Sequence, residues 1–118
     1  MLTVYAYQNC STCRNALKWL ASRGIAHEVK PIREQPPSAG ELARVLDAVG
    51  GDVRRLFNTS GKDYRELKLG EKLKGMSTAD ALKLLRGNGN LVKRPFVVTA
   101  TGGLVGFDAE AWAKVLDR

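Results

Sequence analysis

The sequence contains no long apolar segment, because no run reaches the roughly 18 consecutive apolar residues that a membrane-spanning helix needs. It also lacks a glycine-rich phosphate loop and a dinucleotide-binding fingerprint. The amino terminus enters a β-branched, aromatic stretch at once, without a basic and apolar leader. We therefore expect a cytoplasmic protein with no membrane association and no bound cofactor.

Metal-ligating side chains are scarce. The chain has two cysteines, Cys10 and Cys13, and a single histidine, His27. A closed structural zinc site needs four ligands, so these residues could form one only with a second chain, and we expect no metal. In a reducing cytoplasm, a lone C-x-x-C pair is more typical of redox chemistry or metal binding than of a structural disulfide.

The charge is strongly basic but dispersed. The formal net charge is +7, from 19 Lys and Arg against 12 Asp and Glu. The longest adjacent basic groups are the pairs Arg54-Arg55 and Lys93-Arg94, and there is no polybasic tail or aromatic RNA-binding signature. We expect no direct nucleic-acid binding, which leaves an acidic protein partner, a small anionic substrate or a solvated surface as explanations of the charge.

The length of 118 residues, 44% of them hydrophobic, fits a single domain spanning residues 1–118. Residues 2–7 are rich in β-branched and aromatic side chains and predict a buried strand. Apolar spacing predicts a helix from about Ser11, which Gly24 would end, and residues 25–32 predict a second strand. Such a strand, helix and strand form a right-handed βαβ unit with parallel strands.

A helical insert is predicted over about residues 38–90. Ser38 and Glu41 form a capping box at the start of its first helix, which Gly50-Gly51 would end. Further helical segments are predicted at residues 52–57, 62–69 and from Ser77 to the breaker at 87–90, with a turn at 58–61.

Strands return near the end of the chain. Residues 96–99 and 104–107 flank Gly102-Gly103 and predict an antiparallel hairpin. Asp108 is placed to cap a last helix, whose apolar face would contain Ala109, Trp112, Val115 and Leu116.

Cys10 is the best candidate for a reactive atom. It stands where the first strand gives way to a helix, so the amides and positive dipole end of that helix would stabilise its thiolate. Cys13 lies one turn further on and can reach back to form a disulfide with Cys10 or to resolve a mixed one. Cys13 could alternatively be a small buried hydrophobic residue.

The element order, with C-x-x-C after the first strand and Pro95 before the third, resembles the thioredoxin fold. This resemblance implies an α/β fold with a mixed four-stranded sheet, βαβ then ββα, interrupted by the insert. It also implies a cis Arg94-Pro95 bond facing the cysteines.

Four segments together resemble the arsenate reductase and Spx family, and most of all its small C-x-x-C members known as arsenate reductase-like. They are N-C-S-T-C-R-N at 9–15, E-Q-P-P-S at 34–38, L-F-N-T-S-G-K-D-Y-R-E-L at 56–67 and K-R-P-F-V-V at 93–98.

The family resemblance implies that Cys10 is the nucleophile and that Arg94 activates its thiol and contacts an oxyanion. We expect Cys10, Cys13 and Arg94 to be catalytic, and the substrate to contact a second set, namely Ser11, Thr12, Arg14, Asn58 and Pro95. Arg94 could instead be an ordinary surface charge, and residues 58–60 only a turn.

Two further arginines bind the anion in arsenate reductases of this type, and the matching positions here are Asn58 and Gly106. Each lost contact would weaken anion binding by roughly 1.5 to 3 kcal/mol. Arg54 or Arg55 could supply a charge from nearby.

Cys13 is absent from single-cysteine arsenate reductases but present in Spx-type regulators, where the pair forms a redox switch and the protein binds the RNA polymerase alpha subunit. Those regulators continue with a basic tail, whereas this chain stops at Arg118.

We expect a thiol-disulfide oxidoreductase that acts on a small-molecule or protein disulfide, with glutathione and glutaredoxin or thioredoxin as reductant. An Spx-like regulator and a glutaredoxin-dependent arsenate reductase are the alternatives.

Overall fold

The computed structural model describes residues 2–116. The strands are β1 (Leu2–Ala6), β2 (His27–Pro31), β3 (Phe96–Val98) and β4 (Gly103–Val105). The α-helices are α1 (Ser11–Ser22), α2 (Ala39–Ala48), α3 (Lys62–Glu66), α4 (Leu69–Lys72), α5 (Thr78–Gly87) and α6 (Ala109–Leu116). Three short 3-10 helices complete the chain, η1 (Val53–Leu56), η2 (Leu73–Gly75) and η3 (Gly89–Leu91).

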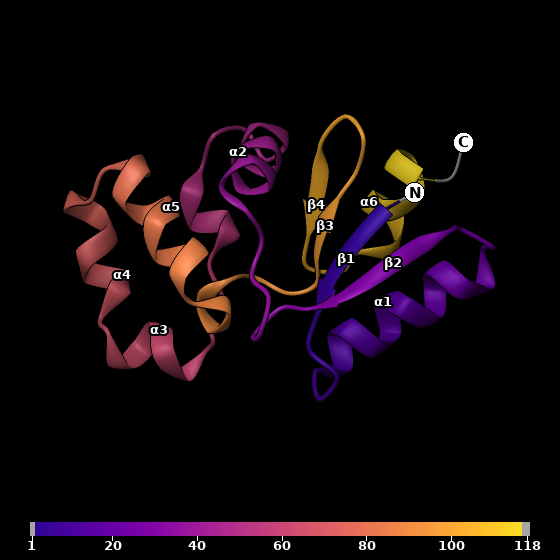
Figure 1. Cartoon of the computed structure of the whole chain (residues 1–118), viewed down its shortest axis with the longest axis horizontal. Coiled ribbons are helices and arrows are strands. Elements are labelled where there is room, and N and C mark those ends of the chain that lie inside the picture. The colour runs from indigo at the N-terminus through magenta and orange to yellow at the C-terminus, as the bar shows by residue number, and fades with distance from the viewer. Residues whose placement is uncertain (1, 117–118) are drawn as a thin grey trace.

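The four strands form one mixed sheet in the order β2-β1-β3-β4 (Figure 1). β1 pairs with β2 in parallel, and β3 pairs with both β1 and β4 in antiparallel fashion. The predicted βαβ unit, the hairpin and the thioredoxin-like α/β architecture are therefore confirmed. The cis Arg94-Pro95 bond is also present, directly before β3.

The two faces of the sheet bury separate apolar clusters, because successive side chains of a strand point to opposite faces. Val4 and Ala6 pack towards α1 and α6, where Cys13, Leu20 and Trp112 are buried with them. The intervening Tyr5 packs on the other face, which α2 covers. The buried residues of that second cluster include Ile32, Leu42, Val45, Leu56, Phe57, Leu85 and Phe96.

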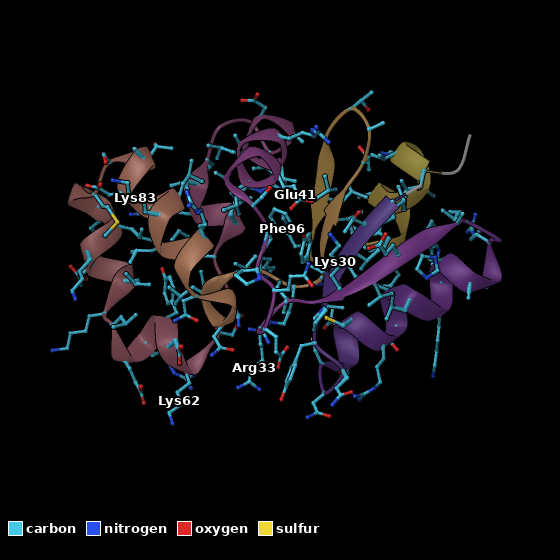
Figure 2. The ribbon with its side chains drawn as sticks, in the orientation of Figure 1. Lys30, Arg33, Glu41, Lys62, Lys83 and Phe96 are labelled. Carbon is cyan, nitrogen blue, oxygen red and sulfur yellow. The ribbon has the colours of Figure 1, made fainter. Side chains whose placement is uncertain are left out.

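The predicted capping box at the start of α2 is confirmed, and it also ties the helix to the sheet. The Ser38 side chain accepts from the Glu41 amide, and Glu41 accepts from the Ser38 amide at 3.0 Å. The same Glu41 carboxylate accepts a hydrogen bond of 2.6 Å from the Tyr5 hydroxyl. Figure 2 shows Glu41 above Phe96, the ring of which lies edge to face with that of Tyr5.

The helices from α2 to η3 form the helical insert, which projects beyond one side of the sheet and elongates the molecule to 42 × 28 × 23 Å (Figure 1). At Gly89, the insert packs closely against the backbone that follows β2. A Cβ at this position would overlap the carbonyl oxygen of Ile32, directly after β2. The glycine-rich segment 87–90 therefore permits a close approach as well as ending α5.

Several predicted boundaries are wrong. The helix expected over 62–69 ends at Glu66, because Lys68 adopts a left-handed conformation (φ 55°) that separates α3 from α4. β4 ends at Val105, where Gly106 (φ 67°) turns the chain towards α6. β2 is shorter than expected, and Val115, assigned to the apolar face of α6, is 39% exposed.

Candidate active site

Cys10 stands directly before α1. A hydrogen bond of 3.0 Å from its amide to the Tyr7 carbonyl closes the turn after β1, and its own carbonyl accepts from the Arg14 amide at 3.0 Å. The Cys10 side chain is half-buried, caps no amide, and has no acidic residue near it in the first turn of α1. Because free amides and the helix dipole favour anions, this end of α1 suits a negative charge beside the Cys10 sulfur.

Cys13 lies one turn into α1 and is only 1% exposed. Burial is the main reason that the pKa of its thiol rises to about 11, and a hydrogen bond to Cys10 and the charge of Cys10 add to this effect. The Tyr7 backbone and the positive charge of Arg94 act in the opposite direction. Both cysteines are free thiols, and Cys10 is the more accessible of the two.

Arg94 brings a positive charge to the Cys13 thiol from a distant part of the chain. Its Nη2 donates to the Asn90 carbonyl at 3.1 Å, and its guanidinium carbon lies 5.4 Å from the centre of the Tyr7 ring. Its Nε is buried and has no hydrogen-bond partner within residues 2–116. An orphaned donor of this kind indicates a group that is prepared to bind an anion.

Tyr7 and Arg33 are site residues that the sequence analysis missed. The Arg33 guanidinium carbon lies 4.9 Å from the centre of the Tyr7 ring, and its Nη1 donates to the Tyr7 hydroxyl at 2.9 Å. Asn9 donates to the same hydroxyl at 3.1 Å. The hydrogen bond from Asn9, followed by the charges and contacts of Arg33 and Arg94, lowers the pKa of Tyr7.

A signal for Arg33 was present in the sequence. It follows β2 by two residues, and Tyr7 follows β1 directly. The two strands are parallel, with Ala6 paired to Pro31. Because the carboxyl ends of parallel strands meet at one edge of a sheet, residues following β1 and β2 are expected to lie close together there.

Around these residues lies a cleft of about 250 Å³, the Arg94 cleft. Its lining residues are Tyr7, Arg33, Asn58, Gly61, Lys62, Asp63, Asn90 and Arg94. They include three cations and one carboxylate, and the Asp63 carboxylate is occupied by hydrogen bonds from Asn88 and Asn90. Figure 2 places Arg33 and Lys62 along the same edge of the molecule. The excess of positive charge suits an anionic ligand.

A second pocket has Cys13 among its lining residues. This Cys13 pocket has a volume of about 450 Å³ and is bounded by α1 and β2. Leu17, Val29 and Pro31 form apolar parts of its wall, and Val29 is 49% exposed. Arg14 also lines this pocket and donates to the Gln8 carbonyl at 3.0 Å. Tyr7 lines both openings, whereas Arg14 lines only the Cys13 pocket and Arg33 and Arg94 line only the Arg94 cleft.

Of the remaining predicted site residues, only Asn58 lines one of the two openings. Asn58 lines the Arg94 cleft, as expected for a wall of the site, and Pro95 is buried at the start of β3. Ser11 and Thr12 are exposed on the first turn of α1. The suggestion that Arg54 or Arg55 supplies a charge beside Arg94 is not supported, because both line a different cleft with Lys93. Arg33 and Lys62 provide the additional charges instead.

The model of the ArsC family matches residues 5–115, a range that includes both cysteines, Arg33 and Arg94. The chain belongs to the ArsC family. This ArsC chain is 45% identical over 116 residues to the uncharacterized protein YusI of Bacillus subtilis, covering 95% of this chain and 98% of YusI. It is 33% identical over 101 residues to an arsenate reductase of Rhizobium meliloti, covering 86% and 71% of the two chains.

Another relative of this ArsC chain is the global transcriptional regulator Spx of Enterococcus faecalis, 27% identical over 118 residues, covering 100% of this chain and 88% of Spx. Among solved structures, an ArsC family related protein from Bacteroides fragilis is 42% identical, with a TM-score of 0.91 and coverage of 97% and 96% of the two chains. The ArsC family thus includes both enzymes and regulators that resemble this chain.

Within residues 2–116, no group of three or more His, Cys, Asp and Glu side chains is placed to hold a metal ion. His27 lies in β2, with Nδ1 2.8 Å from the Ile25 carbonyl oxygen. No helix in this described range of the ArsC chain is long and apolar enough to cross a membrane.

Proposed function

We propose that this ArsC family chain is a cytoplasmic thiol-disulfide oxidoreductase that uses Cys10 as nucleophile and Cys13 as resolving thiol. The observation that carries the proposal is the unequal placement of the pair. Cys10 is half-buried at the start of α1, whereas Cys13 is 1% exposed with a pKa raised to about 11. Such asymmetry assigns the first attack to Cys10.

In the first step, the Cys10 thiolate attacks one sulfur of a disulfide substrate. The substrate S–S bond breaks, a mixed disulfide with Cys10 forms, and the departing thiolate takes a proton from solvent. An anionic substrate would be held in the Arg94 cleft by Arg33 and Arg94, and the free Nε of Arg94 is one available donor.

In the second step, Cys13 loses its proton and attacks the Cys10 sulfur. The mixed disulfide breaks, the second substrate thiolate leaves, and a Cys10-Cys13 disulfide remains. Once Cys10 is in the mixed disulfide, its charge and hydrogen bond no longer oppose ionisation of Cys13, although burial still does. Two electrons from glutathione with glutaredoxin, or from thioredoxin, would then restore the dithiol.

The test is NADPH oxidation coupled through glutathione and glutaredoxin, or through thioredoxin and its reductase, with a panel of disulfides and with arsenate. Cys10→Ser and Cys13→Ser form a matched pair, since each removes one sulfur. We expect Cys10→Ser to abolish turnover and Cys13→Ser to accumulate a mixed disulfide visible by mass spectrometry. Full turnover by Cys10→Ser would refute the mechanism.

A regulatory function is the second candidate, and the similarity to Spx along the whole chain favours it. In that case the Cys10-Cys13 disulfide would form and be reduced without turnover of any substrate. Redox-dependent retention of this chain on the RNA polymerase alpha subunit would then be expected, and it would be lost in Cys10→Ser.

Arsenate reduction is the third candidate, supported by similarity to an arsenate reductase and by the Arg94 cleft. Asn58 and Gly106 replace two anion-binding arginines that the family resemblance implies, and Arg33 and Lys62 bring other positive charges to the cleft. Arsenate-dependent turnover that requires Cys10 would select this candidate over disulfide exchange.

A further inference from the structure

A second basic cleft, the Lys93 cleft, lies between η1, the approach to β3, and β4. Its volume is about 290 Å³. The residues that line it are Arg54, Arg55, Phe57, Thr59, Lys93 and Val105. None of them is shared with the Arg94 cleft, and neither cysteine is among them.

The positive charge of this cleft is not neutralised. Three of its lining residues are cations and none is acidic. The Nη1 of Arg55 donates to the Val49 carbonyl at 3.4 Å, which orients the side chain without cancelling its charge. Within residues 2–116, the cationic groups of Arg54 and Lys93 have no hydrogen bond or ion pair. Three uncompensated cations on one small cleft create a strong attraction for an anion.

Lys93 and Arg94 are adjacent in sequence but line different clefts. The Lys93 amide donates to the Leu56 carbonyl at 2.8 Å, which fixes this residue beside η1. Its stem passes over Gly106, where an added Cβ would lie 3.2 Å from the Lys93 Cε. The glycine at position 106 thus leaves room for the Lys93 side chain, which lines the same cleft as Arg54 and Arg55.

A second pocket continues the Lys93 cleft, because the two share Arg55, Lys93 and Val105. The pocket has a volume of about 360 Å³ and extends to Phe107, which is half-buried before α6, and to Trp112 of α6, which is only 1% exposed. Its one acidic lining residue, Asp108, is engaged as the cap of α6, accepting from the Glu110 amide at 3.0 Å. The combined groove therefore has a cationic end and an end of mixed polar and apolar character, in which Leu104 and Phe107 are partly exposed.

We propose that this groove binds a small molecule that joins a phosphate-like dianionic head to a flat apolar body. The head would accept hydrogen bonds from Arg54, Arg55 and Lys93, with the Thr59 hydroxyl as a neutral donor. The body would enter the adjoining pocket towards Phe107. The inference is independent of the proposed redox function, since it uses none of the thiol-site residues.

Phenyl phosphate, inorganic phosphate and phenol are suitable probes, titrated by calorimetry and by amide chemical shifts into the full chain. We expect phenyl phosphate to bind saturably and more tightly than either fragment, with shifts at amides 54–59 and 103–107. Arg54→Gln and Lys93→Met should each weaken it about tenfold, which corresponds to loss of one charge-assisted contact. Lys83→Met is the matched control, because Lys83 is an exposed residue of α5 outside both clefts, and this variant should bind phenyl phosphate as the unchanged chain does.

Three results would overturn the proposal. The first is the absence of saturable phenyl phosphate binding, and the second is unchanged affinity in Lys93→Met and Arg54→Gln. The third is binding that disappears in Arg94→Gln and shifts amides 7–10, because it would place the anion in the Arg94 cleft. Circular dichroism and thermal melting of each variant show that it is folded before its affinity is compared.

Discussion

At the scale of single residues, the functional asymmetry of the two cysteines comes from burial. Cys10 directly precedes α1 and Cys13 lies in its first turn, yet Cys13 packs with Val4, Ala16 and Leu20 while Cys10 stays partly open. Transfer of a thiolate into apolar surroundings is unfavourable, so burial is the leading cause of the raised pKa of Cys13. A short C-x-x-C motif thus contains one accessible and one protected thiol.

The resolving step should accelerate as pH rises. Burial still raises the pKa of Cys13 in the mixed disulfide, and at any pH below that pKa the Cys13 thiolate fraction grows about tenfold per pH unit. We expect the rate at which a Cys10 mixed disulfide with thionitrobenzoate releases its chromophore to follow that trend from about pH 7 to 9. Cys13→Ser is the control and should release none without added thiol. A rate that is flat over this range would contradict the burial argument.

Arg33 should contribute to the recognition of anionic substrates. Arg33→Gln removes an exposed cation from the Arg94 cleft, so we expect KM for a dicarboxylate disulfide to rise about threefold to fivefold. KM for an uncharged disulfide such as hydroxyethyl disulfide should stay the same. Arg86→Gln, which removes an equivalent exposed charge from α5, is the matched control. Equal effects of the two substitutions would exclude a specific role for Arg33.

At the scale of elements, Gly87 and Gly89 differ in whether the structure has room for a side chain at the glycine position. Both belong to the segment that ends α5 and were predicted simply as a helix breaker. A Cβ at Gly89 would overlap the backbone after β2, whereas a Cβ at Gly87 would meet nothing within 4 Å. Gly89 is therefore required by the packing of the helical insert against the sheet.

The two glycines should respond in opposite directions to alanine. Gly89→Ala should lower the free energy of unfolding by about 1 to 3 kcal/mol, because a backbone carbonyl must move. Gly87→Ala should raise it by about 0.5 to 1 kcal/mol, since alanine loses less backbone entropy in a helix. Urea denaturation followed by circular dichroism measures both changes. Stable folding of Gly89→Ala with an unchanged midpoint would show that this contact is dispensable.

At the scale of the whole molecule, the Arg94 cleft is lined both by residues beside the sheet and by residues of the helical insert. Figure 1 shows these two parts of the chain side by side. Tyr7, Arg33 and Arg94 come from segments that adjoin strands, whereas Asn58, Lys62 and Asn90 belong to the insert. The net charge of +7 adds a long-range attraction for anions to these local contacts. The insert therefore contributes lining residues to the Arg94 cleft as well as buried residues to the core.

This long-range attraction should be visible in the salt dependence of turnover. We expect kcat/KM for an anionic disulfide to fall severalfold as ionic strength rises from about 0.02 to 0.3 M, because salt screens exposed charges. For hydroxyethyl disulfide, kcat/KM should change little. An equal decline for both substrates would indicate a general salt effect on the chain instead of electrostatic recognition.

The sequence by itself determined the order of the elements, the capping box at Ser38, the hairpin and the position of the cysteines at the start of α1. These features depend on residues close together in the chain, whose periodicity and capping chemistry act locally. It also indicated Arg94 through the adjoining Pro95 and the family resemblance. Features that depend on residues close together in the sequence could therefore be predicted from the sequence.

Only the tertiary structure decided which distant charges share a cleft. Arg33 meets Tyr7 across 26 positions because β1 and β2 pair in a particular parallel register. Arg54 and Arg55 face Lys93 instead of Arg94 because η1 is bonded to the chain just before β3. The direction of a side chain at such a junction depends on strand register and helix packing, which local sequence patterns do not specify.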